Sequence, residues 1–139
     1  MGDFVTRRRV EFADTDMEGI VHFARFFVFL ETAEHELLRS LGHEVHARDP
    51  DGTRTTWPRV EATCRYTSPA RFGDELEIRM RAARVGRTSV TYEAEIRCEG
   101  RLVAEGRTTA VRCRVTEEGL QPVPLPPALS EALTATSDD

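Results

Sequence analysis

The chain has 139 residues, 40% hydrophobic and 31% charged, which fits one globular domain and excludes an intrinsically disordered chain. Its formal net charge of −5 argues against a nucleic-acid partner, although all 19 basic residues are arginines, whose guanidinium groups suit phosphate or carboxylate. The widely spaced Cys64, Cys98 and Cys113 form no disulfide or zinc pattern and no apolar leader is present, so we expect a cytoplasmic protein with reduced thiols and without a membrane span.

The first predicted element is a strand over residues 4–12. Phe4, Val10 and Phe12 fall on one side of a loose alternation, and charged residues fall on the other. The strand should therefore bury one face. An acidic turn follows it.

A long helix is predicted over residues 23–41, where apolar side chains recur every three or four positions. Gly42 follows the last of them and suits the left-handed residue that ends many helices. The first half is apolar most of the way round, so we expect it to be deep. Polar residues gather in the second half, which we expect to surface; they are Glu31, Glu34, His35, Glu36 and Arg39.

Residues 43–57 contain Asp-Pro-Asp-Gly and are predicted to form a loop. Strict alternation then predicts strands over residues 60–66, 76–82 and 90–98. A last segment, residues 102–115, alternates less cleanly and is interpreted as a strand covered on both faces. Turn residues between the segments favour antiparallel neighbours.

The remaining segment, residues 116–139, is a proline-rich extension with one or two helical turns over 127–134 and a loose tail from 136. We expect one domain over residues 1–139, with its core at about 4–115. One strand, one long helix and four further strands predict an α+β fold. Its antiparallel five-stranded sheet has only the one large helix against which to bury a face.

The acidic turn is the best candidate for chemistry. It places Asp14, Asp16, Glu18 and His22 before a helix N-terminus, whose free N–H groups bind negative charge. Asp16 is either a helix N-cap or a reacting group. Asp14 is interpreted as an acid that holds the turn. No metal site is expected, because three ligands in one tight turn lack a distant fourth.

A family resemblance rests on three features. They are Asp14-Thr15-Asp16 followed by Gly19-Ile20-Val21-His22-Phe23, an aromatic helix that carries Glu31, and the turn Ser68-Pro69-Ala70-Arg71-Phe72-Gly73-Asp74. Over residues 5–115 the chain resembles hotdog-fold acyl-CoA thioesterases of the 4-hydroxybenzoyl-CoA thioesterase type and their Tol–Pal-cluster relatives. The resemblance implies a hotdog fold, an acyl-CoA substrate and a homodimer or homotetramer with active sites between subunits. It implies no cofactor, because coenzyme A enters as part of the substrate.

The resemblance assigns three catalytic positions. Asp16 is the carboxylate that acts as nucleophile or general base, and the backbone N–H of Phe23 polarises the thioester carbonyl. His22 stands where the family usually has an aromatic residue, so it is either a general acid or a wall of the pocket.

The predicted substrate-binding residues fall into three groups. Arg84 and Arg87 lie near the hairpin before residue 90, where they either meet coenzyme A phosphates or are simply solvated. Aromatic residues of the helix either line an acyl pocket or belong to the core. Glu31 is interpreted as a buried or interfacial acid, with His35 as its partner. The full set is Gly19, Ile20, Phe26, Phe27, Glu31, Trp57, Arg84 and Arg87.

Two other classes of function stay open on the sequence. One is a non-catalytic module that uses the same fold to hold an acyl thioester or a partner protein. The other is a hotdog dehydratase or hydratase, although the paired histidine and acid of those enzymes occur in a different motif. Turnover of acyl-CoA esters separates hydrolysis from both.

Overall fold

A computed structural model describes residues 3–48 and 51–137 of the chain. Its elements, in chain order, are β1 (Phe4–Arg9), the 3₁₀ helix η1 (Phe12–Asp14), α1 (Arg25–Ser40), β2 (Ala47–Arg48), β3 (Arg54–Thr56), β4 (Arg59–Tyr66), β5 (Glu75–Val85), β6 (Ser89–Cys98), β7 (Arg101–Val111), β8 (Cys113–Thr116), β9 (Gly119–Pro122) and α2 (Pro127–Ser137).

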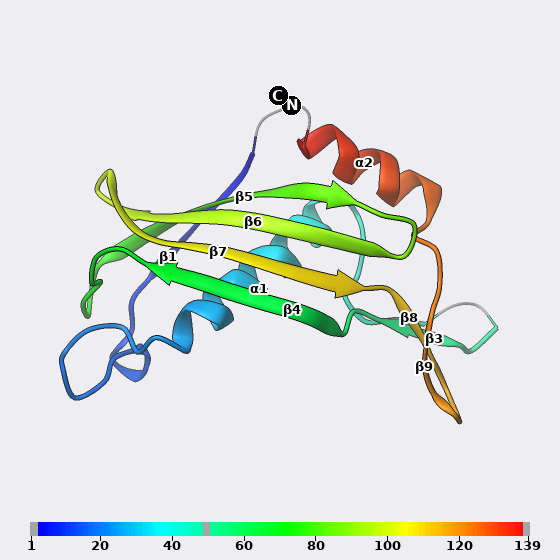
Figure 1. Cartoon of the computed structure of the whole chain (residues 1–139), viewed down its shortest axis with the longest axis horizontal. Helices are drawn as coiled ribbons and strands as arrows, with labels where there is room; N and C mark the ends of the chain where they lie inside the picture. Colours follow the sequence, from blue (N-terminus) through cyan, green and yellow to red (C-terminus); the bar gives the residue numbers. More distant parts are fainter. Residues whose placement is uncertain (1–2, 49–50, 138–139) are drawn as a thin grey trace.

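The main sheet has five antiparallel strands in the order β1-β5-β6-β7-β4, with α1 lying against one face (Figure 1). The predicted α+β fold is therefore confirmed. Phe29, Leu30 and Ala33 of α1 are fully buried against the sheet, at the three- and four-residue spacing that the sequence displays. Close packing is visible at Gly106 of β7, where an added Cβ would lie 2.4 Å from Leu30 Cδ1.

The helix α1 differs from its prediction in its first residue and in the burial of its second half. It begins at Arg25 rather than Phe23, because residues 23 and 24 form a turn. The expectation that its second half surfaces is wrong, since Leu37 and Leu38 are fully buried. The sheet covers α1 along its whole length, so the apolar stripe rather than the number of charges decides burial. Gly42 has φ +82°, the left-handed conformation predicted for the end of the helix.

Three further boundaries differ from the predicted ones. Residues 43–57 are not wholly a loop, because β2 and β3 pair there. The predicted strand over 102–115 breaks at Arg112, whose N–H donates to Thr88 O, and β8 then pairs with β3. The first strand ends at Arg9, and Phe12 is 80% exposed rather than buried.

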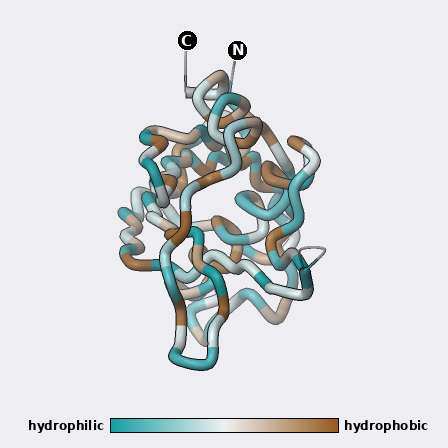
Figure 2. The backbone as a smooth tube through the Cα atoms, turned by 90° about the vertical axis from the view of Figure 1, so that its right-hand side faces the viewer, coloured by the Kyte–Doolittle hydropathy of each residue, from teal (hydrophilic) through white to brown (hydrophobic). Residues whose placement is uncertain are grey.

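A second sheet, in the order β2-β3-β8-β9, forms beside one end of the first. Figure 2 shows the β8–β9 hairpin extending from the body of the chain with a hydrophilic tip. The C-terminal helix α2 is longer than the one or two turns predicted. It packs on β5, and its Leu129 and Leu133 side chains are buried in the core.

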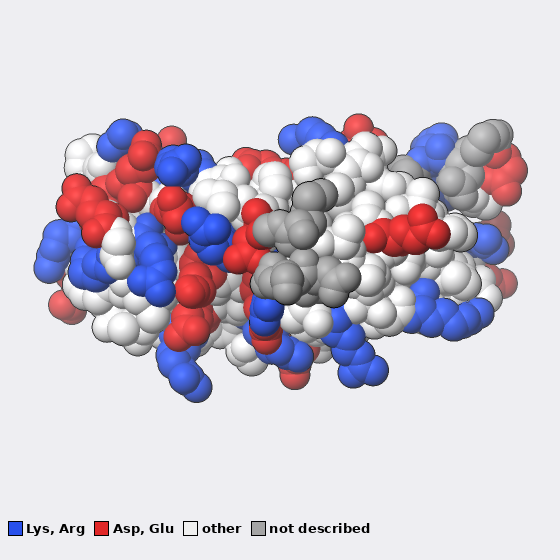
Figure 3. Space-filling model, turned by 90° about the horizontal axis from the view of Figure 1, so that it is seen from above, with Lys and Arg blue, Asp and Glu red and all other residues white. Residues whose placement is uncertain are grey.

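The outer face of the main sheet is charged, as the alternation predicts. Arginines and glutamates face each other across neighbouring strands, as in Arg7–Glu77 at 3.1 Å and Arg81–Glu93 at 3.3 Å. Seen from above, Figure 3 shows blue and red side chains interspersed at the left end of the molecule. Such exposed pairs add little stability but keep the face polar.

Strand β4 forms an edge of the sheet, and its predicted buried face is not covered. Val60 is 65% exposed and Tyr66 is also exposed, although both belong to the apolar side of the alternation. Edge strands with exposed apolar side chains are templates for pairing with another chain.

The three cysteines are free, and neither α1 nor α2, the α-helices of the described residues, is long and apolar enough to cross a membrane.

Candidate active site

The turn that carries Asp16 is a tight hairpin across residues 15–21. The Asp16 N–H donates to Ile20 O at 3.0 Å, and the Gly19 N–H donates to Asp16 O at 2.9 Å. Gly19 has φ +79°, a conformation that glycine adopts at no steric cost. The Val21 N–H donates to Ala70 O at 2.8 Å, so the hairpin is anchored to the turn before β5.

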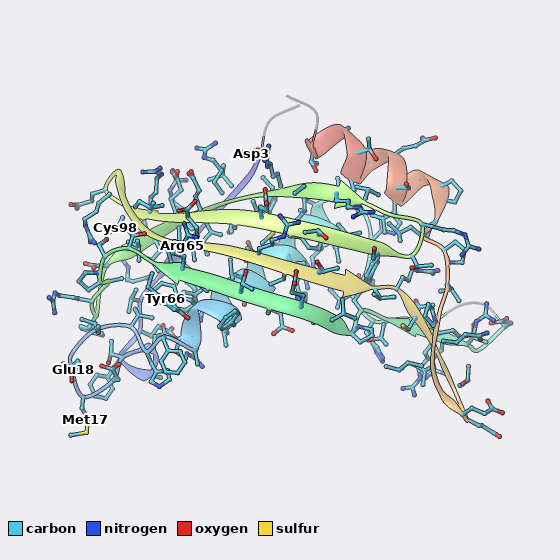
Figure 4. All side chains as sticks on the ribbon, viewed as in Figure 1. Asp3, Met17, Glu18, Arg65, Tyr66 and Cys98 are labelled. Carbon is cyan, nitrogen blue, oxygen red and sulfur yellow. The ribbon has the colours of Figure 1, made fainter. Side chains whose placement is uncertain are left out.

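Asp16 is half-buried and does not cap α1, which begins nine residues later with no side-chain hydrogen bond at Ala24. Its Oδ1 accepts the Glu18 N–H at 2.9 Å. Its Oδ2 has no hydrogen-bond partner in the part of the chain that the structure describes. One carboxylate oxygen is therefore fixed, and the other is free for a substrate or a water molecule. Figure 4 shows Met17 and Glu18 at the outer tip of this hairpin.

Asp14 holds the turn, as the sequence suggests. It is fully buried, and its Oδ1 accepts two hydrogen bonds from Arg25, at 2.9 Å from Nε and 2.7 Å from Nη2. Its Oδ2 accepts the Glu11 N–H at 2.8 Å, and its carbonyl accepts the His22 N–H at 2.9 Å. Asp14 thus ties η1 to the start of α1, and every carboxylate oxygen is occupied.

Phe23 presents an unused backbone donor. Among the described residues, no hydrogen bond uses the Phe23 N–H, whereas the carbonyl of the same peptide, His22 O, accepts the Arg25 N–H at 2.9 Å. The Phe23 side chain is 61% exposed. A free N–H at the start of a helix lies at the positive end of the helix dipole, so it suits a developing negative charge.

His22 is oriented by the helix start. Its Nδ1 accepts the Ala24 N–H at 3.1 Å, and its ring stacks on that of Phe23 with centroids 4.6 Å apart. An Nδ1 atom that accepts a hydrogen bond carries no proton, so the neutral imidazole has its proton on Nε2. In this arrangement His22 can donate from Nε2 but cannot accept a proton at Nδ1 without losing the Ala24 contact.

The predicted substrate-binding residues divide between surface and core. Phe26 and Trp57 are buried in the core, and Phe27 is half-buried. Glu31 is not a buried acid within one chain, because its carboxylate is exposed, 3.8 Å from Arg59 and 3.9 Å from His35; the alternative of an interfacial acid stays a prediction. Gly19 and Ile20 belong to the Asp16 hairpin.

Arg84 and Arg87 are not brought to Asp16 in one chain. Both are exposed near the β5–β6 hairpin, at the end of the sheet opposite the turn that leads into α1 (Figure 1). A single chain therefore separates the predicted phosphate contacts from the predicted carboxylate.

Two features of the site region escape the sequence patterns. The Tyr66 hydroxyl donates to Phe23 O at 3.0 Å, and Figure 4 shows Tyr66 at the end of β4 near the start of α1. Glu34 is buried in α1, where burial raises the pKa of its carboxyl to about 7 against the opposing effect of Arg59. Arg59 Nη2 donates to Glu34 Oε1 at 2.6 Å. Their partners are distant in sequence, so no local signal marks either contact.

A curved antiparallel sheet around one long helix, with a carboxylate hairpin leading into that helix, is the architecture of hotdog thioesterases. The family model "Thioesterase superfamily" matches residues 18–105 of the chain. The chain belongs to the thioesterase superfamily, and it is an enzyme of the thioester hydrolase class.

Relatives agree with that membership. The chain is 29% identical over 138 residues to a 1,4-dihydroxy-2-naphthoyl-CoA hydrolase of Synechococcus elongatus, covering 99% of this chain and 100% of the relative. It is 31% identical over 104 residues to the acyl-CoA thioester hydrolase YbgC of Escherichia coli, covering 74% and 76%. A crystal structure of a 1,4-dihydroxy-2-naphthoyl-CoA thioesterase from Synechocystis matches with TM-score 0.82 and 25% identity over 96% of each chain.

Proposed function

We propose that the protein hydrolyses an acyl- or aroyl-CoA thioester to the free acid and coenzyme A, with Asp16 as the reacting carboxylate. The observation that carries the proposal is that one short segment, residues 16–23, carries both an Asp16 oxygen and a Phe23 N–H that have no hydrogen-bond partner among the described residues. The names of the relatives support the acyl-CoA substrate class.

The reaction needs two separate contributions. The Asp16 carboxylate either attacks the thioester carbonyl carbon or takes a proton from an attacking water. The carbonyl oxygen then carries negative charge, which the Phe23 N–H stabilises. The C–S bond breaks and the thiolate leaves as coenzyme A. If Asp16 acts as a general base, the oxygen of the attacking water becomes part of the acid, and the proton that Asp16 took passes to the thiolate. If Asp16 is the nucleophile, it holds the acyl group as a mixed anhydride; a water molecule then cleaves this anhydride to the acid, restores the carboxylate and supplies the proton for the thiolate. No cofactor takes part in these steps.

A second copy of the chain completes the proposed site. Antiparallel pairing of two β4 strands about a two-fold axis places the Arg59 end of one copy beside the Tyr66 end of the other. The exposed Val60 supports association at this edge. In such a homodimer, or in a tetramer built from it, the arginine-bearing end of one copy approaches the Asp16 hairpin of the next. Arg84 and Arg87 then contact coenzyme A phosphates across the interface.

The cell compartment is part of the same proposal. Free cysteines are typical of a reducing environment, and coenzyme A esters are handled there. We therefore propose a cytoplasmic enzyme.

The test is release of free thiol from a panel of acyl-CoA esters that includes 1,4-dihydroxy-2-naphthoyl-CoA, benzoyl-CoA and straight-chain esters. We expect turnover of at least one ester and a loss of about 10²- to 10⁴-fold in kcat for Asp16→Asn, as removal of a general base or nucleophile produces. Glu18→Gln is the matched control, because it neutralises an exposed carboxylate two residues away. Asp16→Asn with wild-type kcat/KM in a folded protein would overturn the assignment.

A further inference from the structure

The Phe23–Ala24 peptide is held at both ends by side chains. Its carbonyl oxygen accepts the Tyr66 hydroxyl at 3.0 Å, and its N–H donates to His22 Nδ1 at 3.1 Å. The preceding peptide is held at His22 O by the Arg25 N–H at 2.9 Å. Of the four polar atoms in these two peptides, the Phe23 N–H alone has no partner among the described residues.

This arrangement determines where the free donor points. Two planar peptide units that share the Phe23 Cα can turn only about its two backbone dihedrals. Fixing both planes therefore fixes the direction of the Phe23 N–H. No side chain caps α1 at Ala24, but His22 Nδ1 accepts the Ala24 N–H in the way an N-cap side chain accepts a free N–H.

Tyr66 is itself fixed and is a donor at neutral pH. Its ring packs against that of Phe26, with centroids 5.4 Å apart and planes inclined by 59°. Phe26 is buried in the core and packs edge-on against Phe29. Burial and the neighbouring Cys64 raise the pKa of the Tyr66 hydroxyl, so it keeps its proton. Tyr66 is the last residue of β4, and its hydroxyl joins that strand to the first turn of α1.

We propose that Tyr66 is a positioning residue for the reaction, because its hydroxyl aims the Phe23 N–H at the thioester carbonyl oxygen. This inference rests on the proposed function. It assigns β4 a role besides pairing: the strand that forms the free edge also sets the geometry of the oxyanion donor, 43 residues away in the chain.

The first experiment compares Tyr66→Phe with the wild type on the ester that the panel identifies. The substitution removes the hydroxyl and keeps the ring against Phe26, so the fold should persist. Since a misaimed donor weakens the transition state more than the ground state, we expect kcat to fall about 10- to 100-fold with KM changed less than about 3-fold. Tyr92→Phe is the control, because the buried Tyr92 hydroxyl has no hydrogen bond among the described residues.

The second experiment measures the thioester carbonyl directly. A loss of rate alone does not distinguish a misdirected Phe23 N–H from a change in the packing around Tyr66. The thioester C=O stretching frequency is measured by Raman difference spectroscopy for the ester bound to Asp16→Asn and to Asp16→Asn with Tyr66→Phe. We expect binding to the Asp16→Asn protein to lower the C=O frequency below that of the free ester. In the protein that also carries Tyr66→Phe, the frequency of the bound ester should return toward that of the free ester. If the bound ester has the same frequency with and without Tyr66→Phe, or if Tyr66→Phe has the wild-type kcat, the positioning role is overturned and the proposed function is left intact. A wild-type protein that hydrolyses no ester overturns both.

Discussion

Arg59, at the start of the edge strand β4, donates a 2.6 Å hydrogen bond to the buried carboxylate of Glu34 at the centre of α1. The Thr108 side chain favours the charged form of this carboxylate, whereas the charge of Glu31, one helical turn away, disfavours it. Burial dominates these effects and raises the pKa of Glu34 to about 7. The link between helix and edge strand is therefore sensitive to pH.

The stability of the protein should fall between pH 5 and pH 8. The unfolded chain has Glu34 at its ordinary pKa of 4.5, so the folded state binds more protons over this interval. The stabilising contribution is complete below pH 4.5 and is lost as the pH rises through about 7. The shift corresponds to about 3 kcal/mol.

Glu34→Gln should flatten that dependence, because glutamine does not titrate and still offers Arg59 a carbonyl acceptor. Urea unfolding of both proteins at pH 5, 6, 7 and 8 gives the measurement. Glu131→Gln, an exposed position on α2, is the control and should keep the wild-type slope. Equal slopes in the wild type and Glu34→Gln would show that another group titrates.

Arg25→Gln should destabilise the fold by about 3 kcal/mol, because it removes both side-chain donors to Asp14 Oδ1 and leaves a fully buried carboxylate with only the Glu11 N–H. Denaturant unfolding measures the change. Arg7→Gln is the matched control, since its pair with Glu77 is exposed and should be worth less than about 1 kcal/mol.

A double mutant tests the reason for the Arg25 effect. In an Asp14→Asn background no buried charge remains, so Arg25→Gln should cost much less there. Equal costs in both backgrounds would mean that Arg25 acts through packing of its stem and not through the carboxylate.

Gly106→Ala should destabilise the protein by about 1–3 kcal/mol, because the new methyl would lie 2.4 Å from Leu30 Cδ1 between β7 and α1. Thermal unfolding gives the change. Leu30→Val removes the Cδ atoms that collide, so Gly106→Ala should cost less in that background. Strictly additive costs would contradict the direct contact.

Val60→Asp should convert the proposed dimer into monomers, because it places a carboxylate on the exposed edge strand, where a symmetric partner would bring a second one close. Analytical ultracentrifugation measures the mass, and thiol release measures activity, which should fall with it. Leu120→Asp makes the same chemical change at an exposed site on β9 and should alter neither. A wild type that sediments as one chain, or a Val60→Asp variant that remains paired, would exclude this edge as the interface.

Local patterns predict the elements of this fold well. Strict alternation predicts strands that the structure confirms as β5 and β6, and helical spacing predicts α1, because in each case one buried face imposes the period. Pairing between distant segments decides the rest. Residues 54–56 become a strand because β8 lies beside them, and the period of β4 predicts burial that one chain does not provide.

The candidate site likewise has features that local patterns predict and contacts that depend on distant segments. The acidic turn is recognisable from the spacing of Asp14, Asp16 and Gly19, because its hydrogen bonds are made within a few residues. The contact between Tyr66 and the Phe23 carbonyl spans 43 positions and leaves no periodic trace. Arg25 lies on the helical pattern, but its bond to Asp14 depends on how the chain enters α1.

The two edges of the main sheet are unlike. Strand β1 pairs with residues 75–80 of β5, and α2 packs along β5 with Leu129 and Leu133 buried (Figure 1). At the opposite side, no strand of the described residues pairs with the outer edge of β4. A two-fold pair joined at β4 would use this edge in both copies, so any further growth of the sheet would have to start from the β1 side, where α2 already packs on β5.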